Sequence, residues 1–179
     1  MAGGSERDIV RVELRWALAM GALSAAILAV IVFTAIAMGI NPPSNAETID
    51  PKTLHRSGEF TEANLGTSVD PGGQVVTRMI ATQFAFVPQC VVVPEHTPVT
   101  MRFTTPDVIH GILVTGTNVN TMVVPGYISQ VHTTFTKAGD MLMPCQEYCG
   151  FGHSSMIAHV RVVPKDQFRP GPDGKISCG

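Results

Sequence analysis

Charged residues are scarce in this chain of 179 residues, at 15% of the total against 45% hydrophobic residues. The formal net charge is −2, so the chain lacks the basic excess that neutralises phosphates, and no nucleic acid partner is predicted. Four cysteines are too few for a fold built from disulfides, and none forms the C-x2-C pair typical of zinc sites. Tryptophan occurs once, as Trp16, and no internal repeat is visible.

One long apolar stretch near the N-terminus accounts for much of this shortage of charge. Residues 16–40 contain no charged side chain, and about 20 apolar residues let a helix cross the hydrocarbon core of a bilayer. A cleaved signal peptide is the alternative, since Ser44-Asn45-Ala46 offers small residues for cleavage. The apolar cores of signal peptides, however, run to only about 7–15 residues. We therefore predict an uncleaved transmembrane helix over residues 16–40.

Basic residues predict the orientation of this helix. Three arginines lie within residues 1–15, whereas Lys52 and Arg56 are the first basic residues after the apolar stretch. An excess of basic residues marks the cytoplasmic side, so residues 1–15 are predicted to be a cytoplasmic segment and the remainder to face outward. Residues 41–74 are rich in Pro, Gly, Ser, Thr and Asn. We predict that they form a linker over the membrane surface or a partner subunit.

Short apolar runs separated by Gly and Pro turns follow this linker. Such runs are typical of strands in a β-sandwich or barrel. Strands are predicted over residues 74–86, 90–93, 98–104, 109–114, 127–135, 140–143 and 157–163. Residues 75–163 are therefore predicted to form one mainly β domain, large enough to bury a core. The polar residues 164–179 are predicted to be an irregular tail.

Near the end of this domain, two thiols, an imidazole and a thioether lie within twelve residues. Cys145, Cys149, His153 and Met156 form the pattern C-x3-C-x3-H-x2-M, and these soft and borderline ligands suit copper. Structural zinc sites do not recruit Met, and a blue-copper site uses a single Cys. A disulfide between the two cysteines would leave the His and the Met unexplained. The second thiol therefore predicts two copper ions bridged by thiolates in an electron-transfer centre.

Such a centre needs a second imidazole, and His110, 35 residues before Cys145, is the candidate. At this point the chain resembles a known family. The segment P-D-V-I-H-G at residues 106–111, followed by C-x-E-x-C-G-x-G-H-x-x-M, resembles subunit II of the haem-copper oxidases. Residues 116–120 and 124–126 resemble its ba3-like branch, which has one transmembrane helix. The resemblance implies a cupredoxin-like Greek-key β-sandwich or barrel that carries a dinuclear copper A centre.

The resemblance also implies which residues bind the metal. The copper ligands would be His110, Cys145, Glu147, Cys149, His153 and Met156. Both cysteines would bridge the ions, with the carbonyl of Glu147 and His153 on one copper, and His110 and Met156 on the other. In oxidases with Glu at position 147, its carboxylate also binds magnesium at the interface with subunit I. The ba3-like relatives have Gln there, so the chain departs from that branch, and magnesium binding remains a hypothesis.

The function implied by the resemblance is that of the subunit at which electrons enter a terminal oxidase. It would accept electrons from cytochrome c or a small copper protein and pass them to haem in subunit I, where oxygen is reduced to water and protons are pumped. The chain would catalyse nothing alone, since no nucleophile–base pair or open catalytic metal position is visible. It would lie in lipid, in a prokaryotic plasma membrane, with the copper domain on the outer face.

Three alternatives are weighed against this interpretation. A copper A subunit of a membrane nitric oxide reductase cannot be distinguished from the sequence, because the active site would lie in the partner. A membrane-anchored mononuclear cupredoxin carrier or copper chaperone would not need Cys145. A zinc-stabilised β domain would not need Met156.

The roles of several other residues stay open. Cys90 and Cys178 would face an oxidising exterior and could form a disulfide or stay as free thiols, or Cys178 could carry a lipid. Asp107 could hydrogen-bond near the copper loop, face a partner, or simply follow Pro106 in a turn. Many relatives with two transmembrane helices carry an exposed Trp where electrons enter, and by resemblance Phe84 and Phe86 occupy the corresponding aromatic segment. Because this Trp is missing, electrons are expected to enter through an apolar patch near the copper.

Overall fold

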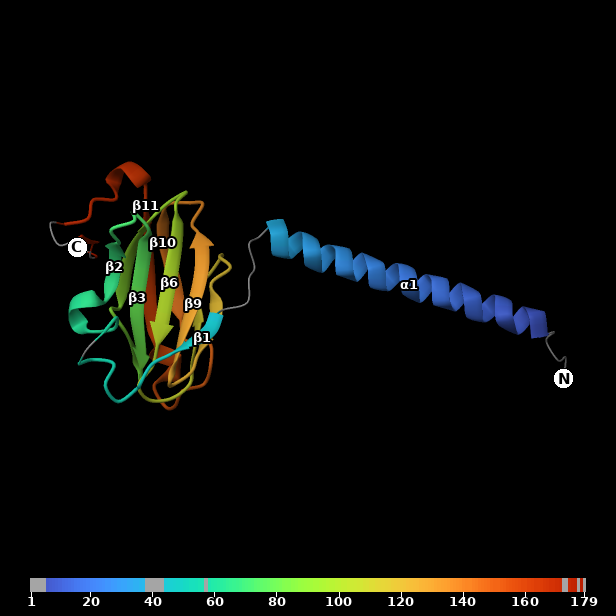
Figure 1. The fold of residues 1–179 in the computed structure, drawn as a ribbon, viewed down its shortest axis with the longest axis horizontal. Coiled ribbons are helices and arrows are strands. Elements are labelled where there is room, and N and C mark those ends of the chain that lie inside the picture. The colour runs from blue at the N-terminus through green and yellow to red at the C-terminus, as the bar shows by residue number, and fades with distance from the viewer. Residues whose placement is uncertain (1–5, 38–43, 57, 172–173, 177, 179) are drawn as a thin grey trace. The chain divides into compact units, whose positions relative to one another are not determined.

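The computed structural model describes residues 6–37, 44–56, 58–171, 174–176 and 178. The chain divides into two compact units, Met1–Ile40 and Asn41–Gly179, and each is described by itself. Figure 1 shows the helix of the first unit and the strands of the second.

Helix α1 (Glu6–Ala37) is the one helix among the described residues that is long and apolar enough to cross a membrane. Its charge-free part, residues 16–37, is roughly 33 Å long at about 1.5 Å per residue, which matches a hydrocarbon core of about 30 Å. The helix begins ten residues before the predicted span. Acidic Glu6 and Asp8 in its first turn favour a helix N-terminus there. Residues 38–40 of the predicted span lie outside the described residues.

The second unit is built from two main sheets and a hairpin. The large sheet has the order β1 (Ser44–Thr48), β9 (Tyr127–Thr134), β6 (Pro98–Thr104), β3 (Val75–Thr82), β2 (Gly66–Val69) and β12 (Lys175–Ile176), with β4 (Ala85–Val87) paired to β3. The small sheet has the order β10 (Gly139–Pro144), β11 (Ile157–Val163) and β5 (Cys90–Pro94). Strands β7 (His110–Leu113) and β8 (Asn120–Val123) form the hairpin. Short 3-10 helices cover Glu62–Asn64 (η1), His153–Ser155 (η2) and Lys165–Gln167 (η3).

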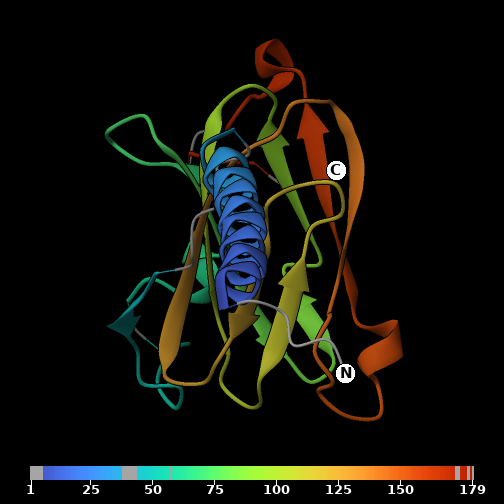
Figure 2. The same ribbon diagram turned by 90° about the vertical axis from the view of Figure 1, so that its right-hand side faces the viewer.

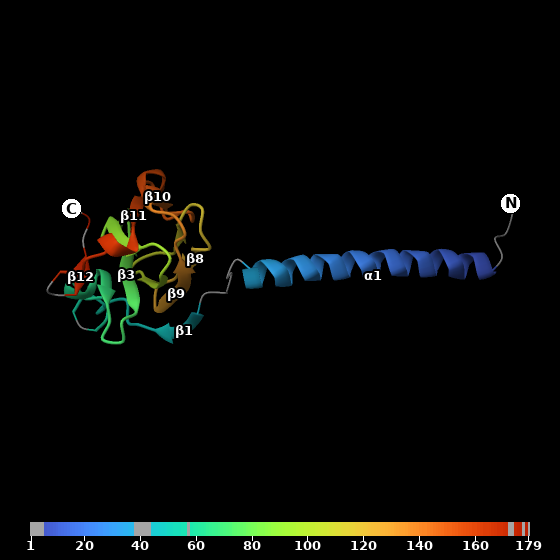
Figure 3. The same cartoon turned by 90° about the horizontal axis from the view of Figure 1, so that it is seen from above.

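The main core lies between the two sheets. Alternate residues of β6 are buried, among them Met101 and Phe103, and alternate residues of β11 are buried as well, among them Val160 and Val162. These side chains belong to one hydrophobic cluster, and each fully buried one contributes about 1.5–3 kcal/mol. Figure 3 shows β10 and β11 in one layer and β3 and β9 in the other, and Figure 2 gives the layers from the side. The prediction of a mainly β fold with one N-terminal apolar helix is confirmed.

The predicted strands over residues 98–104 and 157–163 match β6 and β11 residue for residue. The predicted strand over residues 74–86 is divided into β3 and β4, because the chain turns back at residues 83–84. Four short strands, β1, β2, β8 and β12, were not predicted. They are two to five residues long, and so short a stretch shows little apolar alternation.

Residues 44–69 differ from the expected linker, because they pack onto the β unit. They supply β1 and β2 to the large sheet. Leu54 and Phe60, 1% and 0% exposed, form a second core with Ile80 and Ile128. These two buried side chains attach a stretch that is otherwise largely exposed or half-buried to the face of the sheet. Residues 41–43 of the predicted linker lie outside the described residues.

The tail after residue 163 is also attached to the β unit. Strand β12 pairs with β2, and Cys178 forms a disulfide with Cys90 on β5, with the two Cα atoms 6.0 Å apart. The disulfide is one of the alternatives left open by the sequence. The prediction of an irregular tail is therefore wrong for Lys175 and Ile176, because pairing with β2 orders them.

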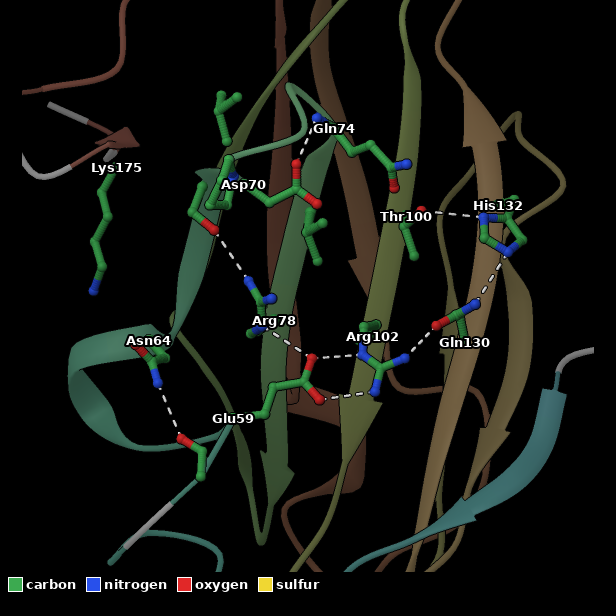
Figure 4. Close-up of a pocket in the computed structure, with 15 residues that line it drawn as sticks. Glu59, Asn64, Asp70, Gln74, Arg78, Thr100, Arg102, Gln130, His132 and Lys175 are labelled. Carbon is green, nitrogen blue, oxygen red and sulfur yellow. Dashed lines mark hydrogen bonds and ion pairs between the residues drawn. The ribbon is translucent and has the colours of Figure 1, made fainter.

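An ion-pair network on the outer face of the large sheet connects β1 to β6. Arg102 donates through Nη2 to Glu59 Oε2 at 2.7 Å and through Nη1 to Glu47 Oε1 of β1 at 3.1 Å. Arg78 also donates to Glu59, at 2.9 Å. Figure 4 shows Arg78, Glu59 and Arg102 joined across the polar groove on this face, with Gln130 beside them. The hydrogen bond from Arg102 lowers the pKa of Glu47 below its ordinary value of 4.5.

This network predicts that acid loosens β1. Because the pKa of Glu47 is lower in the folded chain, its stabilising effect is present above pH 4.5 and is lost as pH falls through the folded value. Amide hydrogen exchange in the full chain in detergent, corrected for intrinsic rates, should show less protection of β1 on acidification. Glu47→Gln should remove most of this pH dependence, whereas Glu62→Gln on η1 should retain it. Equal pH dependence in the wild type and Glu47→Gln would contradict the prediction.

Candidate metal centre

The predicted copper loop is attached to strand β7, which begins at His110. His110 is fully buried. The Gln146 N–H donates to the Gly111 carbonyl at 3.1 Å, and Ile112 forms an isolated antiparallel bridge with Cys145. A Cβ atom on Gly111 would lie 2.9 Å from the backbone nitrogen of Glu147. Glycine at position 111 therefore lets the loop approach β7 closely.

The loop itself connects β10 to β11 and is closed by its own backbone. The Cys145 N–H donates to the Met156 carbonyl at 2.9 Å, which joins the two ends of the loop. The His153 N–H donates to the Gly150 carbonyl at 3.1 Å, and the Met156 N–H donates to the His153 carbonyl at 3.1 Å. These bonds form the turn of η2 and place the side chains of His153 and Met156 next to the two cysteines.

Sulfur and nitrogen donors from β7 and this loop gather at one point. The Sγ atoms of Cys145 and Cys149 are 3.9 Å apart. His110 Nδ1 lies 3.8 Å from Cys145 Sγ, and His153 Nδ1 lies 3.8 Å from Cys149 Sγ. Met156 Sδ is 3.7 Å from Cys149 Sγ. Each thiol therefore has an imidazole of its own beside it.

The donor set fits a copper site. Donors that bind one ion at about 2.0–2.3 Å can be up to roughly 4.5 Å apart, so separations of 3.7–3.9 Å allow a shared ion. Donor atoms of His110, Cys145 and Cys149 all lie within 4.8 Å of one another, the one such cluster of His, Cys, Asp or Glu in the part of the chain that the structure describes. Thiolate, imidazole and thioether together favour copper over hard cations.

Glu147 contributes differently from the other predicted ligands. Its carbonyl accepts a hydrogen bond from the Cys145 thiol at 3.3 Å, whereas the residue is exposed. The carbonyl is therefore at the cluster and the side chain is in contact with solvent. All six predicted site residues are brought together, and their role as ligands stays a prediction.

The surroundings of Cys149 control the protonation of its thiol. Burial, and then the neighbouring thiol of Cys145, raise the pKa of Cys149 to about 11. The Cys149 thiol therefore keeps its proton at neutral pH until a cation displaces it. Metal binding here must release protons, which makes copper affinity increase with pH.

Asp107 orients His110, which resolves one of the alternatives left open by the sequence. Asp107 Oδ1 lies 2.9 Å from His110 Nε2. Its carboxylate also accepts hydrogen bonds from Thr82 Oγ1 at 2.8 Å and from the N–H groups of Gln83 at 2.7 Å and Val108 at 2.6 Å. Partial burial acts to raise the pKa of Asp107, but the hydrogen bonds outweigh it and hold the pKa well below its usual range. The ionised carboxylate keeps the proton of His110 on Nε2 and leaves Nδ1 free to bind a metal.

Gln83 and Phe84, between β3 and β4, contact the copper loop at Cys149, Gly150 and Gly152. Gln83 Nε2 donates to the Cys149 carbonyl at 2.6 Å. The Phe84 ring lies against Gly150 and Gly152, and a Cβ atom on Gly152 would come within 2.6 Å of that ring. Sequence reasoning missed the contact of Gln83, since nothing in the local sequence connects it with a loop 66 residues away.

Comparison with known proteins places this site in a family. The family model described as the periplasmic domain of cytochrome c oxidase subunit II matches residues 74–163. Cytochrome c oxidase subunit 2 of Thermus thermophilus is 33% identical over 149 residues, which cover 83% of this chain and 88% of the relative. A probable cytochrome c oxidase subunit 2 of Rickettsia prowazekii is 37% identical over 78 residues, 44% of this chain and 25% of the relative.

A solved structure agrees at the level of the fold. A chain from the cryo-EM structure of a haem-copper terminal oxidase dimer has a TM-score of 0.65 and 24% sequence identity, and covers 87% of this chain and 99% of that chain. The match of the family model includes the whole copper loop and His110. The chain therefore belongs to the cytochrome c oxidase subunit II family, as a single-pass membrane subunit with a copper-binding cupredoxin domain.

Proposed function

We propose that the chain binds two copper ions and passes electrons through them to the haem of subunit I in a haem-copper oxidase. The proposed ligands are His110, Cys145, Cys149, His153, Met156 and the carbonyl of Glu147. The observation that carries the proposal is the pair of buried thiols, 3.9 Å apart, each with its own imidazole. A mononuclear cupredoxin site uses one thiolate, so Cys145 would have no role in it.

The residues around the cluster suit electron transfer. When bound, copper supplies reversible one-electron oxidation and reduction. The chain keeps the donors still and dry: Cys145, Cys149 and Met156 are 6%, 5% and 1% exposed, and Asp107 restrains the ring of His110. Because the groups around the donors are already in place, little rearrangement of the site is needed when an electron arrives or leaves.

We propose that the electron donor, cytochrome c or a small copper protein, docks on the exposed aromatic side chains of the copper loop. Tyr148 is 72% exposed, and Phe151 is fully exposed. Aromatic residues are enriched where protein partners meet. The formal net charge of −2 provides only modest long-range steering. The complex as a whole would then reduce oxygen to water and pump protons.

We propose the following arrangement in a prokaryotic plasma membrane. Residues 1–15 lie in the cytoplasm, and residues 16–40 cross the lipid. The second unit, Asn41–Gly179, which we call the head, lies on the outer face. Every described residue of α1 from Glu6 to Phe33 is exposed, which leaves its apolar surface available to lipid and to subunit I. The proposed copper domain extends beyond residues 75–163. This is supported by β1, which pairs with β9, and by Cys178, whose disulfide joins it to β5 in the same compact unit.

We also propose that the exposed carboxylate of Glu147 binds magnesium at the interface with subunit I, because hard carboxylate oxygens suit this ion. Glu147→Gln in the assembled complex should lose a bound magnesium or manganese ion. Unchanged metal content would contradict this part of the proposal.

The copper proposal is tested on the full chain in detergent. The chain is loaded with copper, and the copper content per chain and the EPR spectrum are recorded. Two coppers with a seven-line hyperfine pattern would support the proposal, because one unpaired electron is then shared between two equivalent metals. One copper with a four-line pattern would contradict it and indicate a mononuclear carrier.

A further inference from the structure

Gln83 connects the two halves of the metal site. It lies in the two-residue turn between β3 and β4, where Thr82 pairs with Ala85. Its backbone N–H donates to Asp107 Oδ2 at 2.7 Å, and its side-chain Nε2 donates to the Cys149 carbonyl at 2.6 Å. Asp107 in turn contacts His110 at 2.9 Å. Gln83 therefore contacts both Asp107, which orients the imidazole of His110, and the backbone carbonyl of Cys149.

We propose that Gln83 is a positioning residue that holds His110 and Cys149 in a constant relation to each other. The inference rests on the copper site proposed above. In this role Gln83 fixes the distance between His110 and Cys149, which come from separate elements, and it does not contact the metal itself.

The local structure explains why such a connection is needed. His110 is on β7, whereas Cys149 is in the middle of the loop between β10 and β11. The residue after Cys149 is Gly150, at a φ of +131°, in a region that glycine adopts freely and other residues rarely do. A glycine at this point gives the backbone next to the Cys149 thiol more conformational freedom than any other residue would. The hydrogen bond from Gln83 to the Cys149 carbonyl restrains the peptide just before it.

Phe84 extends the same contact along the loop. Its ring lies against Gly150 and Gly152, where a side chain on either glycine would collide with it. In the turn between β3 and β4, the ring of Phe84 therefore covers the glycine-rich part of the loop, and the side-chain amide of Gln83 forms a hydrogen bond to it. Both contacts come from neighbouring residues of one hairpin, so they act on the loop together.

The test uses Gln83→Glu, which keeps the length of the side chain and the backbone N–H to Asp107. It replaces the amide donor by a carboxylate, so an attraction to the Cys149 carbonyl becomes a repulsion between oxygens. Gln89→Glu is the matched control: Gln89 is exposed in the turn between β4 and β5, and the change in charge is the same. Gln83→Ala, which removes the donor without adding charge, provides a second variant.

The first measurement needs no metal. In the copper-free full chain in detergent, the thiols available to an alkylating reagent are those of Cys145 and Cys149, because Cys90 and Cys178 form a disulfide. Gln83→Glu should raise their alkylation rate about 10-fold, as expected if a hydrogen bond that closes the loop is lost. Gln83→Ala should raise it less, and Gln89→Glu should leave it unchanged.

The second measurement uses the copper-loaded full chain. Gln83→Glu should change the copper hyperfine splitting and release copper to a chelator about 10-fold faster, the lower end of the range for outer-shell substitutions. Wild-type rates and spectrum in both Gln83 variants would overturn the proposal. It would also be overturned if each change merely followed a lower midpoint of urea unfolding. If the wild type bound fewer than two coppers, the proposed function would fail, but the alkylation rates would still decide the role of Gln83.

Discussion

Cys149→Ser is expected to abolish the proposed dinuclear copper centre. It should reduce the proposed electron transfer through the chain more than about 100-fold, beyond the range for outer-shell substitutions. The sulfur of Cys149 lies within 3.9 Å of Cys145 Sγ, His153 Nδ1 and Met156 Sδ. A serine oxygen is a harder ligand than a cysteine sulfur, and the serine hydroxyl is a far weaker acid than the thiol. Serine therefore does not replace a bridging thiolate. The donors left around Cys145 can hold one ion at most.

The measurement is copper content with EPR on the full chain in detergent, followed by the rate of reduction by a cytochrome c. The expected change is from two coppers and seven lines to one copper or fewer and four lines. Ser154→Ala is the control, since Ser154 is exposed in the same loop and should keep the wild-type spectrum. Two coppers and seven lines in Cys149→Ser would show that this thiol does not bridge.

Loss of the disulfide between Cys90 and Cys178 is expected to lower the free energy of unfolding of the head by about 4–5 kcal/mol. The bond closes a loop with a sequence separation of 88, and the chain-entropy model assigns roughly this value to a loop of such length. The disulfide also holds the tail so that Lys175 and Ile176 pair with β2. Without it, this short pairing must bear the full entropy of ordering the tail.

The double substitution Cys90→Ala with Cys178→Ala tests this prediction by urea unfolding of the copper-free chain in detergent. A reductant should destabilise the wild type to a similar extent and leave the double variant unaffected. Amide exchange in Lys175 and Ile176 should become faster in the variant. A loss of less than about 1 kcal/mol, far below the 2–5 kcal/mol typical of native disulfides, would contradict the prediction.

The copper loop could be predicted because its donors are close together in the sequence. Cys145, Cys149, His153 and Met156 span twelve residues, so their types and spacing already limit the chemistry. His110 was found through its resemblance to a family motif, and the structure brings it to 3.8 Å from Cys145 Sγ. The strand over residues 98–104 was predictable for a related reason, since alternation of apolar and polar residues is a local property.

Other features of the head depend on contacts that no local pattern contains. Leu54 and Phe60 are buried only because Ile80 and Ile128 lie on a sheet face that they can cover. Asp107 gains its role from Thr82 and Gln83, more than twenty residues away.

Composition and spacing alone thus established an apolar N-terminal helix, a mainly β head and a sulfur-rich copper loop, since each depends on side-chain chemistry within a short window. The long-range contacts were settled by folding: which thiols pair across 88 residues, where the supposed linker packs, and how Gln83 joins Asp107 to Cys149. Each of these depends on the distance between groups far apart in the chain, and only the packing of the two sheets sets that distance.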